Sequence, residues 1–73
     1  MYTLAVVTKL RNIKVAVYES NSLALLRLKA FDMLTPHRRA VLFNEDLEAI
    51  ELIELNEKGY PVNVINDYNV WIE

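Results

Sequence analysis

The chain has 73 residues and a mass of 8.5 kDa, which is enough for one domain and not for two. Hydrophobic residues make up 53% of it, a share typical of a globular protein and not of a disordered one. It contains no cysteine and one glycine, which excludes a disulfide scaffold, a Cys-bound zinc site and a glycine-rich phosphate loop. We therefore expect a single domain over residues 1–73.

The small size of the chain favours association. A domain of about 60–75 residues buries only about 60% of the surface that its unfolded chain exposes, so its core alone gives marginal stability. Disulfides and metal ions usually supplement such a core, and the sequence indicates neither. The remaining supplement is a second copy, so we expect a homo-oligomer, most simply a dimer.

The first part of the chain has the pattern of a β-hairpin. Tyr2–Leu10 is rich in β-branched residues, and Ile13–Glu19 alternates between two faces, as in a strand with one buried side. Arg11 and Asn12 lie between the two segments. Because Arg-Asn lacks the turn preference of Asn-Gly, we predict a loop wider than two residues.

A helix is predicted over Leu23–Leu34. Candidate N-caps occur at Ser20–Ser22, the segment contains no Gly or Pro, and Pro36 disfavours helical geometry at the residue before it. Leu25 and Leu28 widen the apolar face of this helix, so we expect it to be buried on more than one side. The main apolar face consists of Leu23, Leu26, Ala30, Phe31, Met33 and Leu34.

A second helix is predicted over Glu45–Glu57, after a short strand at Ala40–Phe43. Asn44 is a suitable N-cap, and the acidic residues after it suit the positive end of the helix dipole. Gly59 fits the position just beyond the last helical turn. Two further extended segments are expected after it, at Val62–Ile65 and Tyr68–Ile72.

The same region also fits a hairpin. In that alternative, Ile50–Leu55 and Tyr60–Ile65 are strands that flank a turn at Asn56–Gly59. The caps at both ends, together with the spacing of Ile50 and Ile53, favour the helix. The helix is therefore adopted in the predicted fold.

The predicted order of elements is β-β-α-β-α-β. Two helices cannot cover both faces of a four-stranded sheet, so the simplest arrangement is a two-layer α+β sandwich with both helices on one face. The sheet is expected to be mixed and to have four strands, or five if Tyr68–Ile72 joins it.

Charge is divided unevenly along the chain, although the formal net charge is only −2. Residues 1–43 hold seven basic and two acidic residues, a net charge of +5. Residues 44–73 hold one basic and eight acidic residues, a net charge of −7. The small net charge is thus a cancellation, and the asymmetry bears on partners rather than on the fold.

The acidic half provides one candidate surface. On the predicted second helix the carboxylates recur every three residues and occupy one side. That side is a solvated helix face, a surface for the basic face of a larger host protein, or a contact to the basic part of a second copy. The candidate partner-binding residues are Glu45, Asp46, Glu48, Glu51, Glu54 and Glu57.

The basic half provides an alternative site for an anion or a nucleic-acid backbone, or it is simply a solvated surface. The pI of 5.3 and the lack of interleaved aromatic residues argue against nucleic-acid binding. The candidate contacts are His37, Arg38, Arg39, Arg27 and Lys29, which Lys9, Arg11 and Lys14 would extend if the fold brings them together.

Aromatic and aliphatic residues gather near the end of the chain, where they form either a core plug or an interface anchor. If the last strand is a sheet edge with few charges, it can pair with a second copy. The candidate oligomer interface is Tyr68, Val70, Trp71 and Ile72.

No motif indicates an enzyme, a cofactor or a metal ion. The single histidine, His37, is not accompanied by a Gly-x-Ser-x-Gly elbow, and acidic pairs without His or Cys partners are poor metal sites. The apolar stretch near the start, Met1–Thr8, is far shorter than the ~20 residues that span a bilayer. We therefore expect no membrane span and a location in the cytoplasm of the host cell.

Two functional hypotheses follow from these features. The first is a non-enzymatic protein-binding module: an inhibitor or adaptor, encoded by a phage or mobile element, that occupies a surface of a larger host protein such as a defence or nucleic-acid enzyme. The second is a small nucleic-acid-binding regulator that uses the basic half of the chain.

Overall fold

The computed structural model describes residues 1–64 of the chain. These residues form five strands and one helix in the order β-β-α-β-β-β. The elements are β1 (Tyr2–Thr8), β2 (Lys14–Ser20), α1 (Leu23–Met33), β3 (Arg38–Phe43), β4 (Ala49–Leu55) and β5 (Pro61–Asn63).

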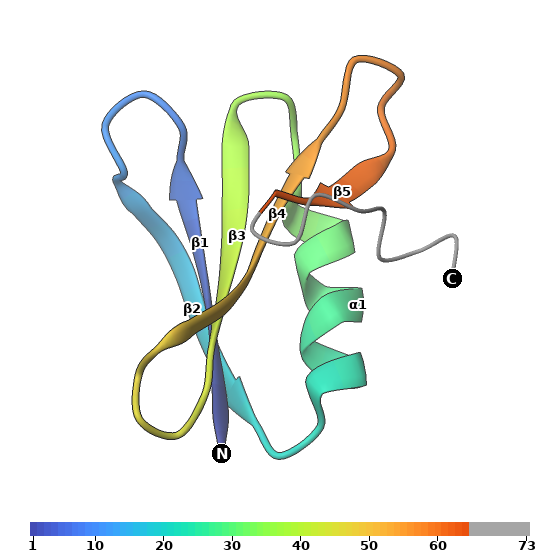
Figure 1. Ribbon diagram of the computed structural model, residues 1–73. Helices are drawn as coiled ribbons and strands as arrows, with labels where there is room; N and C mark the ends of the chain where they lie inside the picture. Colours follow the sequence, from blue (N-terminus) through green and yellow to red (C-terminus); the bar gives the residue numbers. More distant parts are fainter. Residues whose placement is uncertain (65–73) are drawn as a thin grey trace.

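The strands form one sheet in the order β2-β1-β3-β4-β5, in which every neighbouring pair is antiparallel. The helix packs on one face of this sheet and contacts β1, β2 and β3 (Figure 1). The predicted two-layer α+β architecture is confirmed. The predicted mixed sheet is wrong, because no two neighbouring strands of the described sheet run parallel.

The first hairpin follows the prediction closely. Its loop spans residues 9–13, wider than two residues as expected. Thr8 closes the loop: its N–H donates to the Ile13 carbonyl at 2.9 Å, and its Oγ1 accepts from the Ile13 N–H at 3.0 Å. Asn12 adopts a φ of 53°, a left-handed conformation that Asn tolerates better than most residues.

The helix is also confirmed, with an end one residue earlier than predicted. Ser22 is the N-cap, and its side chain accepts from the Leu25 N–H at 3.2 Å. Leu34 ends the helix by donating to the Ala30 carbonyl. The prediction that this helix is buried on more than one side is wrong for the described residues, because Leu25 and Leu28 are exposed.

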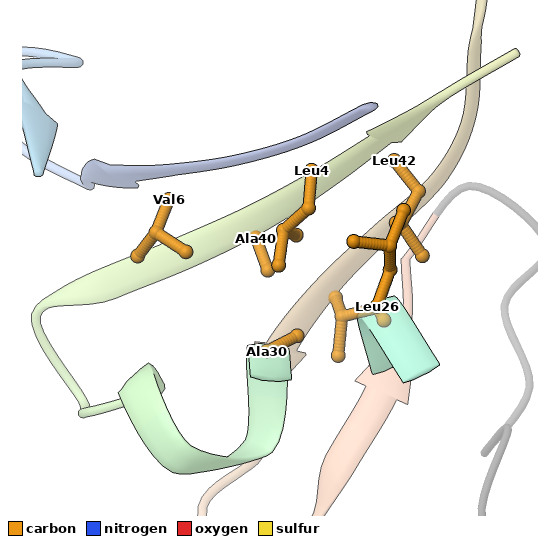
Figure 2. Close-up of a cluster of buried hydrophobic side chains, with 7 residues drawn as sticks. Leu4, Val6, Leu26, Ala30, Ala40 and Leu42 are labelled. Carbon is orange, nitrogen blue, oxygen red and sulfur yellow. The ribbon is translucent and has the colours of Figure 1, made fainter. Parts of the chain in front are cut away.

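The core is small and lies between α1 and the sheet. Figure 2 shows Leu26 and Ala30 of the helix facing the residues of the strands. A core of this size leaves little margin for the loss of any one contact. The fully buried apolar residues are Leu4, Val6, Leu26, Ala30, Ala40, Leu42 and Ile53.

The second predicted helix, Glu45–Glu57, is wrong. Its residues form a turn and then strand β4, and the alternative hairpin with a turn at Asn56–Gly59 is confirmed. Asn44 caps a turn instead of a helix: its Oδ1 accepts from the N–H groups of Asp46 and Glu48, both at 3.0 Å. The side chain of an Asn can satisfy backbone donors equally well in a turn or at a helix start.

The turns before and after β4 have the same construction. In the second turn, Asn56 Oδ1 accepts from the N–H groups of Lys58 and Tyr60, both at 2.9 Å. The fourth residue of each turn has a positive φ, 61° at Leu47 and 83° at Gly59. A positive φ favours glycine, which the second turn has at this position, whereas the first turn has a leucine there.

Substitution of Leu47 by Gly is expected to raise the free energy of unfolding by about 0.5–1 kcal/mol. A leucine in the left-handed region is strained, and Leu47 is 71% exposed, so its side chain contributes little packing. Urea denaturation followed by circular dichroism measures the change. The matched control is Gly59→Ala, which has open space around the new Cβ and should therefore lose stability through its backbone alone. An unchanged midpoint for Leu47→Gly would contradict this account of the turn.

Candidate functional site

The six predicted partner-binding carboxylates are not brought onto one surface. Glu51 is 4% exposed and lies on the face of the sheet that the helix covers. Its carboxylate is held by the Arg27 guanidinium, with Nε at 2.9 Å from Oε1 and Nη2 at 2.8 Å from Oε2. This bidentate ion pair joins helix and sheet, so the Glu51 carboxylate is engaged within its own chain.

Glu54 lies on the opposite face of β4. It sits between two cations, with Oε1 at 3.7 Å from Lys9 Nζ and Oε2 at 3.4 Å from Arg39 Nε. Glu54 therefore neutralises basic residues of its own chain. The remaining four carboxylates are divided between the two turns: Glu45, Asp46 and Glu48 precede β4, and Glu57 follows it.

The two ends of the sheet differ in charge, although Glu54 and Glu57 share the end that holds most of the basic residues. At one end, the loop after β1 meets the connection before β3, where the Lys9 N–H donates to the His37 carbonyl at 2.9 Å. We call this the basic end: Lys9, Arg11, Lys14, His37, Arg38 and Arg39. The opposite end holds the start of β1, the end of β2 and the turn before β4. We call it the acidic end: Glu19, Glu45, Asp46 and Glu48.

Two residues predicted to join the basic site lie elsewhere. Arg27 is engaged with Glu51 on the helix side of the sheet. Lys29 is also on the helix, and its Nζ lies 5.2 Å from the centroid of the Tyr18 ring. The fold instead brings Lys9, Arg11 and Lys14 to the same end as His37, which the sequence left open.

One contact at the acidic end changes the chemistry of a carboxylate. The N-terminal ammonium of Met1 donates to Glu45 Oε1 at 2.7 Å. This hydrogen bond and the positive charge of the ammonium lower the pKa of the Glu45 carboxyl below its ordinary value. Both groups are exposed to solvent, so the contact adds little to stability.

The helix covers only one face of the sheet and leaves the other face uncovered by the described residues. On β1, Thr3, Ala5 and Val7 alternate with buried Leu4 and Val6, so they point away from the helix. The registers of the neighbouring strands extend this face across the sheet. We call it the open face: Thr3, Ala5, Val7, Lys14, Val17, Glu19, Arg39, Val41, Phe43, Leu52, Glu54 and Val62.

The middle of the open face is apolar. Ala5 pairs with Val17 on one side and Val41 on the other, and Val41 pairs with Leu52. These four residues, the apolar row, run across four strands without a polar interruption. Val17 is 46% exposed, and the other three are partly exposed. Strand alternation within the sequence could have identified each residue, but only the strand order places them in one row.

Within residues 1–64 no group of three His, Cys, Asp or Glu side chains could hold a metal ion. A shallow hollow is lined by consecutive residues of one turn, Leu55–Lys58, and His37 is not among its lining residues. None of the helices among these residues is long and apolar enough to cross a membrane.

The predicted oligomer interface at Tyr68, Val70, Trp71 and Ile72 lies outside the described residues, as does the strand predicted at Tyr68–Ile72. Comparison of the chain with known protein families, curated proteins and solved structures finds no match in any of the three.

Proposed function

We propose that this protein is a non-enzymatic protein-binding module whose binding surface is the open face of its sheet. The observation that carries the proposal is the apolar row of Val17, Ala5, Val41 and Leu52, which no described residue covers. An antiparallel sheet with one face in water normally places polar residues on that face. Contact with another protein would remove this apolar surface from water, which is favourable.

The proposed contact surface is the open face and no longer the predicted acidic helix, while the class of function, a protein-binding module, is the same. The predicted acidic helix was the reason to expect a host protein with a basic surface, but its six carboxylates are divided among four places in the structure. An apolar patch with charged residues at both ends has the anatomy of a protein interface, with an apolar centre and a polar rim. An inhibitor or adaptor in the cytoplasm, of phage or mobile-element origin, remains our prediction for the role.

Capture experiments with matched variants test the proposal. The immobilised full chain is exposed to cell extract that also contains labelled copies of the purified chain, and retained proteins are quantified by mass spectrometry. Val41→Lys alters the open face, Leu28→Lys alters the exposed side of the helix, and Glu48→Lys alters the acidic end. Circular dichroism confirms that each variant is folded.

We expect Val41→Lys to reduce the specifically retained proteins by about 10-fold or more, because a charge enters the apolar centre. The other two variants should retain what the wild-type chain retains. Equal retention by Val41→Lys, or loss through Glu48→Lys, would refute the open face as the binding surface. If the wild-type chain retains no protein at all, not even its own labelled copies, the protein-binding function is refuted.

A second candidate function is nucleic-acid binding at the basic end. It is favoured by one observation: the fold brings Lys9, Arg11 and Lys14 beside His37–Arg39. Glu54 opposes it by pairing with two of these cations. Titration of labelled DNA and RNA from low to high salt separates the two functions. Binding that falls steeply with salt, and is lost in Arg11→Glu, would favour this candidate.

A further inference from the structure

We propose that the partner of the open face is a second copy of this chain, packed face to face about a two-fold axis that runs across the strands. This inference rests on the proposed function, since it names the occupant of the same surface. Its basis is the arrangement of charge on the open face. The row that holds Lys14, Arg39 and Glu54 lies on one side of the apolar row, and the row that holds Glu19 lies on the other.

Strand β2 carries the two charges that fix the geometry. Lys14 pairs with Val7 and Glu19 pairs with Thr3, and these two β1 residues lie on the open face. Cross-strand partners share a face, and the register shift of β2 opposite Val6 and Val7 offsets the odd spacing of Lys14 and Glu19. Both residues are therefore on the open face, at opposite ends of one edge strand. Both are exposed, and neither has an ion-pair partner among residues 1–64.

Aligned packing of the two sheets leaves two ways to place one open face on another. When identical faces meet, the two-fold axis lies between the sheets, and it runs along the strands or across them if the strands of the two copies are aligned. An axis along the strands places the basic end of one copy on the basic end of the other. An axis across the strands places β2 over β2 in the opposite direction, so Lys14 of each copy meets Glu19 of the other. Charge complementarity therefore selects the axis across the strands.

The same axis places the apolar row at the centre of the interface. The row lies midway between the pairs Val7–Lys14 and Thr3–Glu19, so Val41 of one copy lies near Val41 of the other. Strands of about 20–24 Å, spaced about 4.8 Å apart, give a total buried area on the order of 1,000 Å². This is the lower limit for a specific interface, so we expect a dimer that dissociates on dilution.

Sedimentation of the full chain over a wide dilution series measures the dimer dissociation constant. The first arm is charge reversal. Lys14→Glu and Glu19→Lys should each weaken the dimer by about 10-fold, because each replaces two attractions with two repulsions. The double variant restores both pairs, so its dissociation constant should return to within about 3-fold of wild type. No rescue in the double variant would overturn the proposed axis.

The second arm identifies the face. Val41→Lys should weaken the dimer by about 100-fold or more, while Leu28→Lys on the helix should leave it unchanged. Leu52→Gln, a milder change in the same apolar row, repeats the test if Val41→Lys does not fold. The dissociation constant could instead be unchanged in the open-face variants and still respond to the charge reversals. The two copies would then be joined through their β2 edges, and the proposal would be wrong.

Two further outcomes separate this inference from the proposed function. A wild-type chain that is monomeric at every concentration overturns the inference. The wild-type chain could still capture a different protein that Val41→Lys no longer captures. The protein-binding function would then hold, with that protein and not a second copy bound to the open face. If Val41→Lys changes neither self-association nor capture, both proposals fail.

Discussion

Substitution of Arg27 by Met is expected to lower the free energy of unfolding by about 3–5 kcal/mol, because it leaves the buried carboxylate of Glu51 without its counter-ion. Small domains have a total stability of about 5–15 kcal/mol or less, so this one change should bring the chain close to unfolding. Glu51→Leu should cost less. Its partner Arg27 is one-third exposed and can turn its charge into water, whereas Glu51 cannot.

The double variant Arg27→Met, Glu51→Leu is the control. It removes both charges, and an apolar pair of similar volume is expected to come within about 1 kcal/mol of wild type. Thermal and urea unfolding of the four proteins form a double-mutant cycle. If Arg27→Met costs no more than about 1 kcal/mol, this ion pair does not lock the helix to the sheet, and the helix must be held by its apolar contacts alone.

The first half of the fold could be predicted because its local preferences agree with its tertiary structure. Ser22 caps the helix, Pro36 lies beyond its end, and the β-branched residues before it pair as a hairpin. Each of these features depends on residues within a few positions of one another. The sequence also favoured Leu26 and Ala30 as core residues, and both are fully buried.

The second half failed because local patterns there have two physical solutions. Asn44 followed by acidic residues fits a helix start, yet the same side chain caps a turn. A stronger indication was present: Asn44–Glu48 and Asn56–Tyr60 both begin with Asn-Glu and fold into the same turn. The leucine at position 47 concealed this likeness, since Gly is the residue expected at a positive φ.

The open face could be predicted only from the order of the strands in the sheet, which the sequence did not determine. Alternation could assign Val17 and Val41 to one side of their own strands. It could not show that β1 lies between β2 and β3, nor that the helix covers the other face. The antiparallel pairing of the strands likewise decides which charges lie together: Glu19 of the basic half lies at the acidic end, and Glu54 of the acidic half lies among Lys9 and Arg39.

The second large effect is expected at Leu26, where replacement by Ala should cost about 3–5 kcal/mol. Leu26 is 1% exposed and lies among the residues of the strands in the core (Figure 2). Its loss removes apolar contact and leaves a cavity beneath the only described helix. Urea denaturation gives the change in free energy, and loss of the helical circular dichroism band shows whether the helix detaches.

The helix provides its own matched controls, since Leu25 and Leu28 are the same residue type and are 53% and 58% exposed. Leu25→Ala and Leu28→Ala should each change the free energy of unfolding by no more than about 0.5 kcal/mol, because Ala has a high helix propensity and little apolar area returns to water. A cost above about 2 kcal/mol at Leu28 would mean that the outer side of the helix is covered in solution. The three leucines thus distinguish a helix with one buried side, as the described chain has, from the helix buried on several sides that its sequence predicted.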